Sequence, residues 1–155
     1  MNKERVKQLL TEALDENEEL FLIELSFLAE NKIYIEVDGN MGVNLKECIR
    51  ISRHINNNLD REEEDFGLEV TSPDVANPLK VLRQYQKNIG RVLTVKTKEN
   101  SKLEGTLVDV KDDEISLEWK AREPKPIGKG KVTVLKTVEI KYSNILEAKV
   151  KIIFN

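Results

Sequence analysis

Residues Leu68 to Leu79 read L-E-V-T-S-P-D-V-A-N-P-L, and this stretch decides how the chain is organised. Apolar and polar residues alternate from Phe66 to Thr71, which is the pattern of a half-buried β-strand. Pro73 ends the strand because proline has no backbone N–H to donate to a neighbouring strand. Pro78 is suited to the first position of a short helix. Two stiff residues around a small polar loop predict a shaped joint between two domains.

The predicted domains are residues 1–80 and 81–155, and their charges differ in sign. The first carries 9 Lys and Arg against 18 Asp and Glu, a net charge of −9, whereas the second carries 16 against 10, a net charge of +6. Such asymmetry indicates that at least one half meets a charged partner. The alternative is that both are ordinary solvated surface. The residues predicted to form the joint are Ser72, Pro73, Pro78 and Leu79.

Composition sets the broad class of the protein. The chain has 155 residues, of which 39% are apolar and 34% charged, as in a soluble globular protein. No apolar run approaches the roughly 18 residues of a membrane span, and the start of the chain does not resemble a secretory signal. The single cysteine, Cys48, excludes an intramolecular disulfide. These features favour a cytoplasmic protein with no membrane contact.

The first half predicts the element order α-β-β-α-β. Asn2 caps a first helix, and two alternating runs, residues 20–29 and 32–37, predict a hairpin. On the first strand the predicted apolar face is Phe21, Ile23, Leu25 and Phe27. Residues 38–42 form a glycine loop that we interpret as a strand-to-helix connection rather than a phosphate cradle, because no lysine–serine pair follows. The second helix has Asn44 as its cap, Glu47 at the capping-box position and a predicted buried stripe of Leu45, Cys48, Ile49, Ser52, Ile55 and Leu59.

The first half contains no combination of side chains that favours catalysis. Cys48 lies on the predicted buried stripe and is interpreted as a core residue. His54 is the only histidine and has no second ligand at metal spacing, which favours a solvent-facing or capping role. Residues 60–65 hold five acids, but no glycine stands where a calcium loop needs its turn, so we interpret them as a solvated loop. We therefore predict no enzyme activity and no metal site.

The second half changes to a strand pattern. A short helix is predicted between Pro78 and Gly90, and residues 91–97, 103–110, 115–119, 132–142 and 148–152 then alternate as five short strands. Strands of this length and spacing predict a small β-barrel. Trp119 is interpreted as a wall or core residue, with a base-stacking role as the alternative.

Residues 120–131, K-A-R-E-P-K-P-I-G-K-G-K, are the candidate RNA contact. Prolines and glycines exclude a helix there, so we expect a mobile loop. It could be a phosphate-contacting arm or only a long solvated hairpin connection. Its basic residues are Lys120, Arg122, Lys125, Lys129 and Lys131.

Several of these segments together resemble one known family. They are K-I-Y-I at residues 32–35, a glycine-containing loop, Glu47-Cys48, I-S-R at 51–53, Leu59-Asp60, L-E-V-T-S-P at 68–73 and Y-S-N-I at 142–145. In this order, over nearly the entire chain, they are similar to the ribosome maturation factor RimP family. The sequence departs from the family pattern at Asp74, Ala76 and Asn77, where the family usually has glycine, an acid and arginine.

The resemblance implies a fold and a function. The implied fold is α+β, with an N-terminal KH-like domain and a C-terminal Sm-like or SH3-like barrel. The implied function is assembly of the small (30S) ribosomal subunit, without catalysis or cofactor. The implied partners are the subunit precursor, ribosomal RNA and a small-subunit ribosomal protein near the decoding centre. The implied oligomeric state of the chain is a monomer. An RNA-binding or interaction adaptor not dedicated to ribosomes remains the alternative. The departures at residues 74–77 predict that a charge-bearing family contact there is lost or moved.

Overall fold

The computed structural model describes residues 2–152, which divide into two compact units between Asp74 and Val75. The described residues contain three α-helices and two β-sheets, so the predicted α+β class is confirmed. Each unit has its own cluster of buried apolar side chains.

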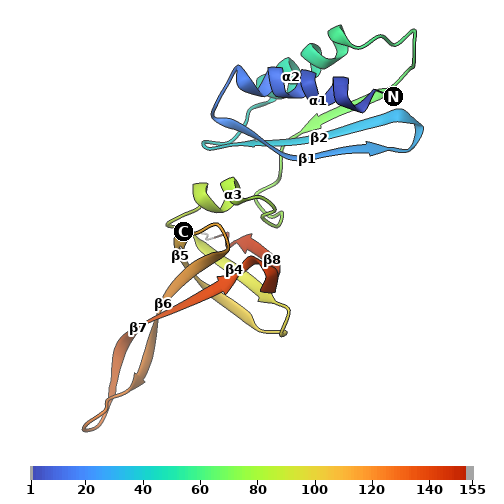
Figure 1. Ribbon diagram of the computed structural model, residues 1–155. Coiled ribbons are helices and arrows are strands. Elements are labelled where there is room, and N and C mark those ends of the chain that lie inside the picture. Colours follow the sequence, from blue (N-terminus) through green and yellow to red (C-terminus); the bar gives the residue numbers. More distant parts are fainter. Residues whose placement is uncertain (1, 153–155) are drawn as a thin grey trace. The chain divides into compact units, whose positions relative to one another are not determined.

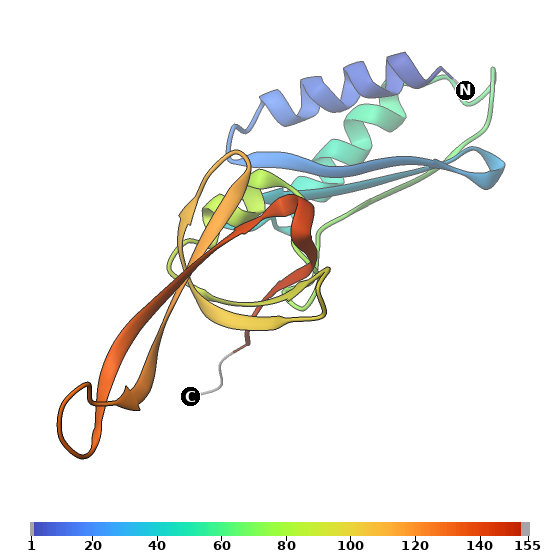
Figure 2. The same cartoon turned by 60° about the horizontal axis from the view of Figure 1, so that its bottom comes forward.

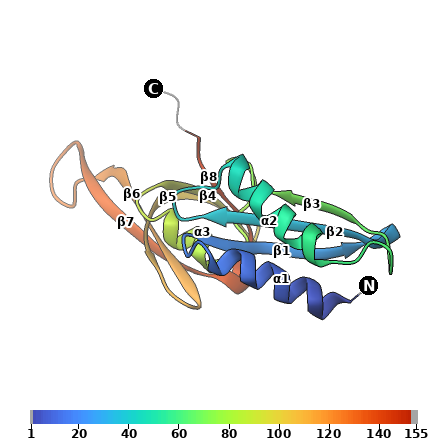
Figure 3. The same ribbon diagram turned by 90° about the horizontal axis from the view of Figure 1, so that it is seen from above.

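The first unit has the predicted order of elements. It consists of α1 (Lys3–Asp15), β1 (Leu20–Leu28), β2 (Lys32–Gly39), α2 (Leu45–Asn58) and β3 (Gly67–Thr71). β1 and β2 form the predicted hairpin, and β3 lies parallel to β2 on its other side. A parallel pair needs a crossover connection, which α2 supplies. Both helices lie on one face of this sheet (Figure 3).

Helix α1 begins and packs as its sequence predicts. The side chain of Asn2 accepts a hydrogen bond from the backbone N–H of Arg5 (3.0 Å), which satisfies one of the free donors of the first turn. The apolar residues at three- and four-residue spacing are buried, and burying a Val or Leu side chain contributes about 1.5–3 kcal/mol. They are Val6, Leu9, Leu10 and Ala13.

The predicted apolar face of β1 is wrong because a β-bulge interrupts the strand. The pairing with β2 shifts between Leu22 and Glu24, so Ile23 is an extra residue. A one-residue insertion moves the following side chains to the opposite face. As a result Leu20 and Leu22 before the bulge, and Leu25 and Phe27 after it, all pack on the core.

The predicted buried face of α2 is also wrong in part. Cys48 and Ile55 are buried as predicted, but Ile51 is buried with them, while Leu45 is 75% exposed and Ile49 is 41% exposed. The helix carries apolar residues over a wider arc than the sheet can cover, and periodicity alone does not show which edge is covered. Asn44 caps the helix by accepting from the N–H of Glu47 (2.9 Å).

Three polar residues of the first unit make contacts that the sequence did not predict. Instead of closing a capping box, the carboxylate of Glu47 accepts a hydrogen bond from Arg50 Nε at 2.6 Å. His54 Nε2 lies 2.9 Å from Glu12 Oε2, so it connects α2 to α1 rather than facing solvent or capping. In the acidic loop, Arg61 stacks on the Phe66 ring at 4.2 Å.

The second unit contains α3 (Leu82–Lys87), β4 (Val92–Thr97), β5 (Lys102–Val110), β6 (Glu114–Pro124), β7 (Lys131–Lys141) and β8 (Ile145–Val150). The five strands form one sheet in the order β7-β6-β5-β4-β8 (Figure 1). In residues 2–152 no pairing joins β7 to β8, so a closed barrel is not found. The core of the second unit consists of Tyr85, Leu93, Val95, Leu107, Ile115, Leu117, Ile140 and Ala148.

Pro78 does not open a helix, contrary to the sequence prediction. The N–H of Leu79 donates to the carbonyl oxygen of Ala148 (2.8 Å), so the chain here lies beside β8. Helix α3 begins only at Leu82, after the extended residue Val81. A nonlocal hydrogen bond therefore decides the local conformation, and it places Leu79 with the second unit.

Candidate nucleic-acid interface

The predicted mobile loop at residues 120–131 is mostly a two-stranded ribbon, which corrects the sequence analysis. β6 and β7 pair continuously from Glu114 opposite Lys141 to Pro124 opposite Lys131, and only residues 125–130 form the loop. The ribbon projects from the rest of the second unit in Figure 2. Beyond Glu118, β6 pairs with β7 alone, because the pairing with β5 ends at that residue. Pro124 has no backbone N–H, but no hydrogen bond to β5 is lost, because β5 does not extend to this part of β6.

Alternation along the ribbon gathers three of the five predicted RNA-contact residues on one side. Lys120 stands opposite Leu135, Arg122 opposite Thr133, and Pro124 opposite Lys131. Residues that face each other across an antiparallel pair, and every second residue along each strand, share one side. We call this side the basic face; it consists of Lys120, Arg122, Pro124, Lys131, Thr133 and Leu135.

The charges of the basic face are available to a ligand. Arg122 is held along the ribbon, with Nη1 donating to Thr133 Oγ1 at 3.1 Å and Nη2 to the carbonyl oxygen of Lys131 at 3.4 Å. None of the three cations of the basic face has an acidic partner in the described part of the chain. On the opposite side of the ribbon, Lys136 pairs with Glu123. One side thus presents unpaired positive charge, which suits phosphate.

Lys125 and Lys129 lie in the loop at the end of the ribbon, apart from the basic face. The N–H of Lys125 donates to the carbonyl oxygen of Gly130 (3.1 Å), and Gly128 and Gly130 turn the chain at φ +89° and +97°. These φ values are costly for residues with a Cβ. Ile127, between the two lysines, is 90% exposed. The ribbon therefore ends in an apolar residue flanked by cations.

Trp119 is half-buried and stands opposite Lys136, on the side of the ribbon that does not carry the basic face. The structure thus places it apart from Lys120 and Arg122. The base-stacking alternative stays a prediction.

The four predicted joint residues belong to two different units. Ser72 and Pro73 follow β3 in the first unit, whereas Pro78 and Leu79 line a pocket of the second unit. The role of these residues as a joint stays a prediction.

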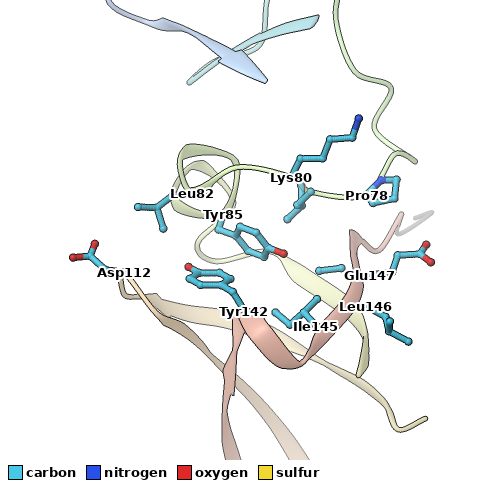
Figure 4. Close-up of a pocket in the computed structure, with 11 residues that line it drawn as sticks. Pro78, Lys80, Leu82, Tyr85, Asp112, Tyr142, Ile145, Leu146 and Glu147 are labelled. Carbon is cyan, nitrogen blue, oxygen red and sulfur yellow. The ribbon is translucent and has the colours of Figure 1, made fainter. Parts of the chain in front are cut away.

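That pocket was not predicted from the sequence. It has a volume of about 470 Å³ and is formed by residues 78–82, α3 and the chain around β8 (Figure 4). Tyr85 and Tyr142 meet edge to face, with ring centroids 5.2 Å apart. Burial raises the pKa of Tyr85 to about 12. Burial also raises the pKa of Tyr142, and the carboxylates of Asp112 and Asp113 raise it further. The pocket depends on contacts between distant segments, which periodicity does not reveal.

The division between the units sharpens the charge contrast. Residues up to Asp74 hold 8 Lys and Arg against 18 Asp and Glu, a net charge of −10, and the remaining residues hold 17 against 10, a net charge of +7. Within residues 2–152 there is no group of three or more His, Cys, Asp or Glu side chains suited to a metal ion. Over the same residues, no helix is long and apolar enough to cross a membrane.

Comparison with known proteins identifies the family. Residues 9–75 match the model of the RimP N-terminal domain. The chain is 56% identical over 154 residues to a ribosome maturation factor RimP of Christiangramia forsetii, which covers 99% of this chain and 100% of the relative. The chain belongs to the RimP family. Another RimP, from Flavobacterium psychrophilum, is 55% identical and covers 98% of each chain, and one from Porphyromonas gingivalis is 36% identical and covers 83% of each. The family resemblance read from the sequence is thus confirmed, and these RimP relatives support a role in ribosome maturation.

Proposed function

We propose that this chain is a non-catalytic assembly factor that acts in the cytoplasm, as a monomer, on the immature small (30S) ribosomal subunit. The observation that carries the proposal is the basic face of the ribbon, found in a chain whose full-length relatives are named ribosome maturation factors. We further propose that the two units are the KH-like and the Sm-like or SH3-like domains implied by the family, and that no cofactor takes part.

Charge divides the proposed contacts between the units. The second unit, at +7, would contact ribosomal RNA through the basic face and the lysines at the end of the ribbon. The first unit, at −10, would be repelled by RNA phosphates over most of its surface. It would instead contact a basic small-subunit ribosomal protein, which we place near the decoding centre.

Sedimentation with ribosomal particles tests the proposed function. We expect the chain to sediment with precursor small subunits and not with mature ones, because an assembly factor must leave the finished particle. Equal binding to both particles, or binding to unrelated RNA with the same affinity, would instead favour the adaptor not dedicated to ribosomes. A labelled chain and a salt concentration held constant make the two particles comparable.

The joint is tested by removing its stiff residues. Replacing Pro73 and Pro78 with glycine should widen the distribution of distances between the units, because glycine releases φ where proline fixes it. Each unit should stay folded, since neither proline belongs to a core cluster. Small-angle scattering of both proteins is the measurement, and Pro126→Gly, in the ribbon loop, is the matched control. Identical scattering profiles would contradict a stiff joint.

A further inference from the structure

The pocket of the second unit has walls that are fixed without a ligand. The N–H of Leu79 donates to the carbonyl oxygen of Ala148 at 2.8 Å. Next to it, the buried carboxamide oxygen of Gln84 accepts from the N–H groups of Lys80 (2.6 Å) and Val81 (3.1 Å). These bonds hold residues 78–81 between α3 and β8. A ligand would therefore bind without having to order the walls.

The hydroxyl of Tyr85 is a polar group of the pocket lining that has no hydrogen-bond partner in residues 2–152. Only 5% of Tyr85 is exposed, and in the described residues its hydroxyl makes no hydrogen bond. Figure 4 shows that hydroxyl pointing into the pocket, toward the side on which Glu147 lies. The neighbouring Tyr142 differs, because its hydroxyl donates to the carbonyl oxygen of Lys111 at 2.9 Å. With a pKa of about 12, Tyr85 stays protonated at neutral pH and can donate one hydrogen bond to a ligand.

The mouth of the pocket is acidic within a basic unit. Its charged lining residues are Lys80, Asp112 and Glu147, and Asp113 is adjacent in the chain. Glu147 pairs with Lys149 at 2.7 Å, whereas Asp112 is exposed and makes no ion pair in residues 2–152. The rest of the lining is mainly apolar, with Leu79, Leu82, Ile145 and Leu146 among its members. This combination suits an apolar group flanked by positive charge and disfavours a phosphate.

We propose that this pocket binds one apolar side chain of an extended, basic protein segment, and that the Tyr85 hydroxyl donates to a main-chain carbonyl oxygen of that segment. Main-chain carbonyls are present in any peptide, so this bond sets position, while the apolar anchor and the flanking cations set specificity. The inference goes beyond the proposed function, which gives protein contacts to the acidic first unit, and it does not require the target to be a ribosome.

Amide chemical shifts of the full-length, isotope-labelled chain test the proposal. The probe is the peptide acetyl-Lys-Lys-Phe-Lys-Lys-amide. We expect saturable shifts at the amides of Leu79, Tyr85, Ile145 and Ala148. A peptide with alanine in place of phenylalanine, and one with glutamate in place of every lysine, should each bind at least tenfold more weakly. Uridine monophosphate should cause no shifts at these residues.

Two substitutions separate the polar contacts from the shape of the pocket. Tyr85→Phe should weaken binding of the peptide by about three- to tenfold, the effect of one hydrogen bond. It should leave the melting temperature unchanged, because the hydroxyl has no partner in the free protein. Asp112→Asn should also weaken binding, whereas the matched change Glu99→Gln, at an exposed residue outside the pocket, should not.

Several results would overturn the proposal. They are an absence of saturable shifts, equal binding of the alanine peptide, binding of uridine monophosphate at the same amides, and unchanged affinity in Tyr85→Phe. None of these results bears on sedimentation with precursor subunits, so the failure of this inference and the failure of the proposed function can be told apart.

Discussion

Replacing Lys120, Arg122 and Lys131 with glutamine should flatten the salt dependence of binding to precursor small subunits by about two to three units of log–log slope. Each contact between a cation and a phosphate releases counterions and contributes roughly 0.7 to 0.9 to that slope. The three residues share the basic face and have no acidic partner in the described part of the chain. Between 50 and 200 mM salt the variant should therefore lose about 20- to 40-fold less affinity than the wild type does.

The end of the ribbon requires its own variant. Lys125 and Lys129 lie in the loop rather than on the basic face, so Lys125→Gln with Lys129→Gln tests a separate contact. If only the end of the ribbon enters the RNA, this pair should change the slope and the basic-face triple should not. Comparing the two locates the contact along the ribbon.

A control of equal charge separates a local contact from a general electrostatic effect. Replacing Arg91, Lys98 and Lys102 with glutamine removes the same three charges from exposed sites outside the ribbon. Long-range attraction should weaken similarly in both triples, whereas the slope should fall only in the basic-face triple. The melting temperatures should agree, because exposed charges contribute little to stability. Equal slopes in the two triples would show that the ribbon makes no phosphate contact of its own.

The features that the sequence predicted correctly are those with a local cause. The stripe of α1, its cap at Asn2 and the hairpin of β1 and β2 follow from spacing and from turn residues near each other in the chain. The positions of β4 and β5 follow from alternation in the same way. Such local signals are sufficient to predict a helix or strand when one face of that element packs against one core.

The errors arise where a distant partner decides the structure. Residues 120–124 appear irregular alone, because Pro124 and the charges break the strand pattern, yet pairing with β7 makes them extended. Pro78 appears to start a helix, but the bond from Leu79 to Ala148 holds the chain beside β8. The bulge at Ile23 inverts a face without changing the pattern of residues. Strand register and strand pairing depend on two segments, so they cannot be predicted from the sequence of one segment alone.

The candidate site was predicted in part for the same reason. The five basic residues were identified by composition, which is local, but their division into a face and a loop depends on register. The pocket depends on Tyr85 and Tyr142, which are far apart in the chain and meet only in the folded unit. The Tyr85 hydroxyl that points into it has no sequence signature at all.

Removing residues before 86 should unfold the second unit, whereas the fragment of residues 75–155 should fold alone. The change to a strand pattern between Pro78 and Gly90 would by itself predict that a fragment of residues 86–155 folds. Tyr85, however, is 5% exposed and belongs to the core of the unit, and Leu79 packs against the same core. A six-residue helix such as α3 has no stability of its own and is held by this packing. The cut therefore removes part of the core rather than a linker.

The size of the expected effect follows from the size of the unit. A domain of roughly 80 residues has a total stability of about 4 to 12 kcal/mol. Loss of a large buried aromatic side chain costs about 3 to 5 kcal/mol, and the loss of Leu79 adds to it. The measurement is the amide spectrum and the thermal melt of both fragments. Tyr85→Ala in the longer fragment measures the contribution of the ring alone. Ile127→Ala, at a 90% exposed site, is the matched control. A dispersed spectrum and a cooperative melt for residues 86–155 would show that α3 is dispensable, and an undispersed spectrum for residues 75–155 would show that the second unit needs the first in order to fold.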